Sequence, residues 1–125
     1  MRKTIKLFFC LVLLFNKSGV GQTFEVIKIA VDSTEFKIGE QINFHIQIKT
    51  DSLYQLQFSE QPNFAPFEVL EDFPLDTLRS QSHYLFNKKY SLIQFDSGNY
   101  WIPKQKININ GIPKITDSIL IRINT

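Results

Sequence analysis

Hydrophobic and polar residues alternate along most of the chain after residue 23. The clearest run is residues 41–49 (QINFHIQIK), in which every second residue is apolar. Successive side chains of a β-strand point to opposite faces, so this run predicts a half-buried strand. One face would carry Ile42, Phe44, Ile46 and Ile48, and the other Asn43, His45, Gln47 and Lys49.

Further β-rich runs follow the same pattern at residues 24–31, 54–58, 67–73, 83–95, 106–110 and 118–124. The run 83–95 is long enough for one bent strand or for two. Clusters of Asp, Ser, Asn, Gly and Pro separate the runs, as is typical of turns. No window has a sustained helical period. Seven or eight short strands predict an all-β fold, and we expect one immunoglobulin-like β-sandwich over residues 22–125.

The first 21 residues have a different pattern. Arg2, Lys3 and Lys6 precede the apolar run Leu7–Phe15, and small residues follow at 19–21. This order is typical of a secretory signal peptide, and nine apolar residues are too few to span a membrane, which needs about 20. We therefore expect a signal peptide at residues 1–21, cleavage before Gln22, and export to the periplasm or cell envelope. A buried N-terminal helix or strand is the alternative.

Removal of residues 1–21 changes the charge and the cysteine content. Four of the 14 Lys and Arg residues lie there, so ten remain against 12 Asp and Glu, and the net charge falls from +2 to −2. Without a polybasic segment, nucleic acid and anionic membranes are not expected partners. The only cysteine, Cys10, would also leave. The mature domain would then depend on its apolar core alone and would have no membrane span.

Residues 96–103 (DSGNYWIP) place two large aromatic residues directly after a turn. A period of two puts Tyr100 and Ile102 on the core face and Trp101 on the outer face. The spacing from Asp96 through Gly98 to Tyr100 matches a tyrosine corner, in which the tyrosine hydroxyl bonds the backbone of the preceding turn. We assign these three residues to such a structural corner. A simple β-turn followed by a buried tyrosine is the alternative.

Trp101, the only tryptophan, is the candidate partner-binding residue, because tryptophan is enriched at binding hot spots. A neighbouring side chain or loop that covers it is the alternative interpretation.

Residues that could carry chemistry are sparse. His45 and His83 lie far apart, and no cysteine accompanies them, so a zinc site is not expected. His45 lies on the polar face of its strand, and we interpret it as solvated. An acidic cluster could bind calcium, but we interpret it as solvated; it consists of Glu68, Glu71, Asp72 and Asp76. The pair Lys88-Lys89 is interpreted in the same way. The sequence contains no nucleophile elbow, P-loop or His-Glu-x-x-His motif, so we expect no enzyme activity, no metal and no cofactor.

Several short motifs follow one another in a particular order. They are Phe36–Ile42 (FKIGEQI), Asp51-Ser52, Pro66–Val69 (PFEV), Asp96–Pro103 and Thr116–Ser118. In this order they resemble the N-terminal immunoglobulin-like domain of BatD-type proteins, the Bacteroides aerotolerance (oxygen-tolerance) family. Such proteins continue through further β-domains to a C-terminal transmembrane segment, so the resemblance implies that this chain is a fragment, a truncated form or a stand-alone relative.

The resemblance also implies a function. It indicates a non-enzymatic periplasmic module for envelope stress or aerotolerance, beside von Willebrand-type and tetratricopeptide proteins and a MoxR-type ATPase. The expected partners are other envelope proteins or further domains of a longer chain. A carbohydrate-binding sandwich is the main alternative; it would stack sugars on Trp101 with Tyr84 or Tyr90, and would need an outward row of aromatic rings. A small hydrolase is the third hypothesis and ranks last, because it would need a pocket with convergent titratable groups and the sequence offers none.

Overall fold

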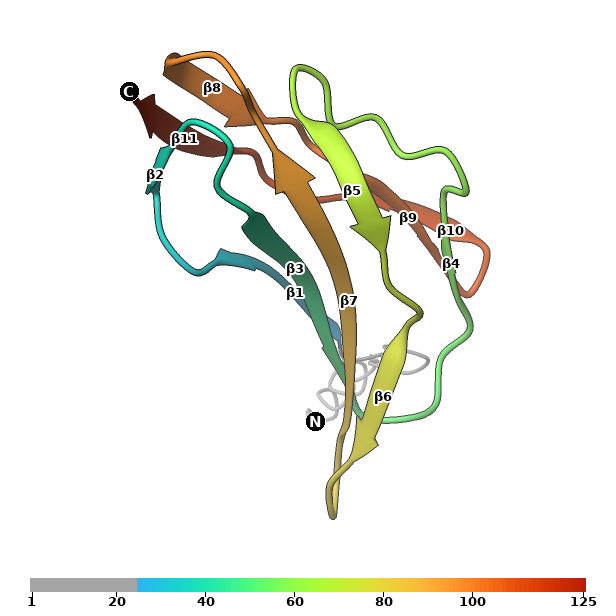
Figure 1. The fold of residues 1–125 in the computed structure, drawn as a ribbon. Helices are drawn as coiled ribbons and strands as arrows, with labels where there is room; N and C mark the ends of the chain where they lie inside the picture. The colour runs from blue at the N-terminus through green and yellow to red at the C-terminus, as the bar shows by residue number, and fades with distance from the viewer. Residues whose placement is uncertain (1–24) are drawn as a thin grey trace, which may run out of the picture.

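The structure is a computed structural model that describes residues 25–125 (Figure 1). The predicted signal peptide and its cleavage site lie outside the described residues. All helical or strand structure in the described part is β-strand, which confirms the all-β prediction. The eleven strands are β1 (Glu25–Val31), β2 (Glu35–Lys37), β3 (Ile42–Thr50), β4 (Leu56–Phe58), β5 (Glu68–Asp72), β6 (Asp76–Arg79), β7 (Tyr84–Ile93), β8 (Gly98–Ile102), β9 (Lys106–Ile109), β10 (Ile112–Ile115) and β11 (Ile119–Asn124).

One layer of the fold is an antiparallel sheet with the order β1-β3-β7-β5, in which β6 also pairs with β7. Strand β7 is continuous over ten residues, so the run 83–95 forms one main strand. A bulge between Val69 and Glu71 shifts the register of β5, and β5 and β6 occupy successive parts of the same edge of β7. Figure 1 shows β7 crossing the whole layer between β3 and these two short strands.

The second layer is built from two three-stranded sheets, β2-β11-β8 and β10-β9-β4. Strands β8 and β9 follow one another along the chain, as do β10 and β11. The Thr116 main-chain N–H donates to the Gln105 carbonyl (2.8 Å), and the Gln105 N–H donates to Thr116 Oγ1 (2.8 Å). These two hydrogen bonds connect the segment between β8 and β9 to the segment between β10 and β11, so the two sheets join into one layer of a β-sandwich.

The turn between β9 and β10 has a defined geometry. Asn110 and Gly111 have φ angles of 52° and 82°. A two-residue hairpin turn of type I′ needs positive φ at both central residues, and Asn-Gly is its preferred sequence. The turn is anchored to the loop before β4, because Asn110 Oδ1 accepts a hydrogen bond from the Gln55 N–H (2.8 Å).

The hydrophobic core lies between the two layers. The alternation predicted for β3 is confirmed, because Ile42, Phe44, Ile46 and Ile48 are all buried. Across from them lie buried side chains of the second layer: Ile102, Ile107, Ile109, Ile121 and Ile123. The segment between β4 and β5 adds Phe64, whose ring packs edge-on against Phe44, with centroids 5.6 Å apart.

Two expectations need correction. The described part of the chain forms eleven strands instead of seven or eight. Several strands are only three or four residues long, and two extended segments are each divided into two strands, β8 with β9 and β10 with β11. Such short strands are defined by hydrogen bonds to their neighbours and leave little pattern in the sequence. His45 was expected to be solvated, but it is half-buried, and its Nδ1 lies 3.2 Å from Asn87 Oδ1. Its strand is central, so side chains of β1 and β7 flank it.

Candidate interaction surface

The turn before β8 is organised by Tyr100. Its hydroxyl donates a hydrogen bond to the Ser97 carbonyl oxygen (3.0 Å), three residues upstream. The ring is half-buried and meets Phe67 edge-on, with centroids 6.0 Å apart. Gly98 has a φ of 142°, and a Cβ added there would lie 3.2 Å from the Tyr100 hydroxyl. Glycine therefore fits this position for two reasons, the backbone conformation and the closeness of the tyrosine ring.

A buried glutamine also supports this turn. Gln94 Oε1 accepts hydrogen bonds from the main-chain N–H groups of Phe95 (2.9 Å) and Asp96 (3.0 Å). Its Nε2 donates to the Pro66 carbonyl (2.9 Å), which ties the turn to the segment before β5. Asp96 thus contributes its main-chain N–H, and its side chain is exposed. Sequence reasoning missed Gln94, because a lone polar residue at the end of a strand has no distinctive pattern.

Trp101 lies on the outer face of the β2-β11-β8 sheet. Its side chain is 56% exposed, and Leu120, directly opposite on β11, is 44% exposed. Beside this pair, Arg122 lies opposite Asn99 on β8 and opposite Glu35 on β2. We call Trp101 and Leu120 the outer apolar pair. An exposed tryptophan next to an exposed leucine, with polar and charged residues alongside, is the arrangement typical of the centre and rim of a binding surface.

The aromatic row required by the carbohydrate alternative is not built around Trp101. Tyr90 is buried in the core, and Tyr84 lies on β7 in the other layer, where it stacks on Phe86 with ring centroids 6.5 Å apart. The neighbour of Trp101 across the strands is Leu120, which is not aromatic. No feature of the outer apolar pair therefore favours sugar binding over protein binding.

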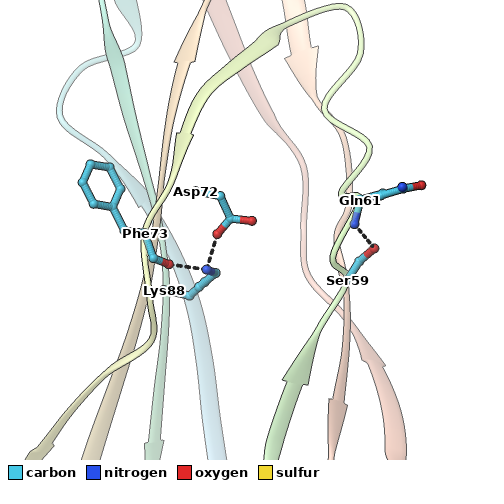
Figure 2. A network of polar contacts seen from close by, with 5 residues as sticks. All are labelled: Ser59, Gln61, Asp72, Phe73 and Lys88. Carbon is cyan, nitrogen blue, oxygen red and sulfur yellow. Dashed lines mark hydrogen bonds and ion pairs between the residues drawn. The ribbon is translucent and has the colours of Figure 1, made fainter.

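A polar cluster in the core centres on Lys88 (Figure 2). Its side chain points to the same side of β7 as Phe86 and Tyr90, and the residue is 8% exposed. The ammonium group donates hydrogen bonds to Asp72 Oδ1 and to the Phe73 carbonyl. It also lies 5.0 Å from the centroid of the Tyr90 ring, within range of a cation–π contact. Figure 2 shows that the hydrogen-bonded pair Ser59 and Gln61 belongs to a neighbouring segment.

The expectation of a solvated Lys88-Lys89 pair is wrong for Lys88. The alternation of Phe86, Tyr90 and Leu92 places residue 88 on the core face, and this signal was available in the sequence. Asp72, one member of the acidic cluster, forms an ion pair with Lys88 that offsets the cost of burying its charge. Burial, and then the nearby Asp72 carboxylate, raise the pKa of Tyr90 well above its usual value.

Residues 25–125 contain no group of three or more His, Cys, Asp or Glu side chains placed to hold a metal ion. The same residues include no helix of the length and apolar character that crossing a membrane requires.

Comparison with known proteins found no matching family model, no matching curated protein and no matching solved structure. The resemblance to BatD-type proteins therefore stays a prediction from the motifs.

Proposed function

We propose that this protein is a non-enzymatic interaction module of the cell envelope, related to the N-terminal domain of BatD-type proteins. The observation that carries the proposal is the outer apolar pair, because its two side chains are exposed on a regular sheet face instead of being covered by a loop. Burial of a large aromatic side chain in a partner contributes strongly to binding, which makes Trp101 the expected anchor.

The strand order supports the immunoglobulin-like part of this proposal. In such domains the order A-B-E-D faces the order G-F-C. Strands β1-β3-β7-β5 and β10-β9-β4 have the same two orders when β1, β3, β4 and β5 are taken as A, B, C and D. The turn that Tyr100 closes lies at the start of β8, the strand directly before β9 in the chain. Sandwiches of this kind serve many functions, so the fold supports the class of domain and leaves the partner to experiment.

The proposal is tested with the variant Trp101→Ala combined with Leu120→Ser. Cells that express the tagged full chain are treated with a crosslinker, and the envelope proteins recovered with it are compared between variant and wild type. The matched control is Ile112→Ser, because Ile112 is 57% exposed and lies on β10, in the other half of the layer.

We expect the double variant to lose a partner that the control retains, with both variants folded by circular dichroism. Identical recovery from the wild type, the double variant and the control would contradict an interaction through this face. Retention by immobilised glycans that is lost with Trp101→Ala would instead favour the carbohydrate alternative.

A further inference from the structure

Strand β1 forms one edge of the first layer. In the described part of the chain it pairs only with β3, through seven consecutive residue pairs from Glu25↔Thr50 to Val31↔Phe44. It contains no proline and no bulge, two devices that commonly protect an edge strand. The outer edge of β1 therefore presents main-chain N–H and C=O groups in a regular extended conformation. A second strand can pair with such an edge.

The core is incompletely covered beside this edge. Ile27, Ile29 and Val31 pack against the core cluster but are only half-buried. A groove of about 330 Å³ lies between β1 and the end of β10, lined by Ile27 and Ile29 on one side and Ile115–Asp117 on the other. Ile115 is 65% exposed. A strand added to β1 would place every second side chain over this groove.

The sequence of β1 is complementary to itself in one antiparallel register. With Ile29 opposite Ile29 of a second copy, Ile27 faces Val31 on the core side, and Lys28 faces Ala30 on the outer side. All core-side pairs are then apolar and β-branched, a favourable cross-strand combination. The register centred on Lys28 would place two lysines opposite each other, which is unfavourable.

We propose that a second copy of this chain binds at β1, and that the two β1 strands pair antiparallel around Ile29. The two first layers then form one continuous sheet with a two-fold axis at its centre, the commonest symmetry of homodimers. This surface lies at an edge of the first layer, whereas the outer apolar pair lies on a face of the second. The homodimer and the proposed partner are therefore independent of each other.

The experiment introduces a positive charge or a negative charge at position 30. In the proposed register Ala30 of each copy faces Lys28 of the other, so Ala30→Lys creates two like-charge pairs in each dimer and Ala30→Glu creates two opposite-charge pairs. The protein is purified from cells that express the full chain, and its mass in solution is followed over a concentration series by sedimentation equilibrium. We expect a concentration-dependent dimer, with a Kd raised about 2- to 30-fold by Ala30→Lys and lowered by Ala30→Glu.

Further variants separate pairing from general effects. Lys28→Glu combined with Ala30→Lys should reverse the effect of Ala30→Lys and lower the Kd below that of the wild type, as Ala30→Glu does, since the charges are again opposite. Leu53→Lys, at an exposed site in the loop between β3 and β4, should leave the Kd unchanged. A wild-type protein that remains monomeric at every concentration would overturn the proposal. So would equal effects of Ala30→Lys and Ala30→Glu, because only pairing with Lys28 distinguishes them.

Discussion

Tyr100 and Trp101 are adjacent in the chain but make contacts of different kinds. The Tyr100 hydroxyl closes the turn before β8, whereas the Trp101 side chain lies beside Leu120 on the outer face. We expect Tyr100→Phe to cost about 0.5–1.5 kcal/mol of folding free energy, the usual net contribution of one hydrogen bond. Urea unfolding followed by circular dichroism measures this loss.

The same measurement on Trp101→Ala should give a loss of about 1 kcal/mol or less, since the side chain is more than half exposed. If Trp101→Ala unfolded the domain while Tyr100→Phe had no effect, the assignment of these two residues to turn and surface would be wrong.

Lys88 and Asp72 should respond unequally to substitution. Asp72→Ala leaves the buried ammonium without its carboxylate, and we expect a loss of about 1–3 kcal/mol. Lys88→Met removes the costly burial of the ammonium group and leaves Asp72, whose side chain is 37% exposed and can be hydrated. We therefore expect Lys88→Met to cost less stability than Asp72→Ala and to unfold within about 1 kcal/mol of the wild type.

The surface pair Lys114–Glu25 provides the control for this comparison, because its lysine is well exposed. Lys114→Met should change the free energy of unfolding by less than about 1 kcal/mol. A loss from Lys88→Met as large as that from Asp72→Ala would show that the ion pair itself is a net source of stability.

At the scale of single elements, the turn between β9 and β10 depends on its backbone. Gly111 has a φ of 82°, and a Cβ placed there would meet no atom within 4 Å. Only the conformational penalty should therefore count, and Gly111→Ala should cost about 1 kcal/mol. Thermal unfolding compared with Gly98→Ala checks this, since the added Cβ at Gly98 also contacts Tyr100 and should cost more. Equal losses at the two glycines would contradict the account of the corner.

The elements differ in how far the sequence predicts them. Strand β3 is predictable because every second residue is apolar and one of its faces is covered by the second layer. Strand β6 is fully exposed, and only its pairing with β7 makes it a strand. Phe64 lies in a segment without alternation, so its burial depends on tertiary packing that no local pattern encodes. Lys88 is wrongly predicted to be solvated, because lysine is usually exposed; its position in the alternation places it on the core face.

At the scale of the whole molecule, the pKa of Tyr90 links stability to pH. In the unfolded chain this pKa is about 10, and in the folded protein burial raises it. The stability gained by keeping Tyr90 neutral is complete below about pH 10 and is lost as pH rises toward the higher folded pKa. The free energy of unfolding should therefore fall more steeply above pH 10 in the wild type than in Tyr90→Phe, by up to about 1.4 kcal/mol per pH unit. Urea unfolding over a pH series measures both slopes, and parallel slopes would contradict a buried, neutral Tyr90.

The candidate interaction surface is less predictable than the fold. Alternation alone predicts that Trp101 faces outward, but the exposed leucine opposite it becomes apparent only from the pairing of β8 with β11. The hydrogen bond from Gln94 Nε2 to the Pro66 carbonyl joins residues 28 positions apart, so no local pattern in the sequence reveals it.

The central claim is that the outer apolar pair contacts a protein partner in the envelope. It is tested most directly by placing a photoreactive phenylalanine analogue at position 101 of the full chain and irradiating living cells. The account predicts a discrete crosslinked product with an envelope protein that mass spectrometry identifies, that is absent with the analogue at Ile112, and that disappears when Leu120→Ser is added. Irradiation that gives the same products from positions 101 and 112, or none from either, would contradict it.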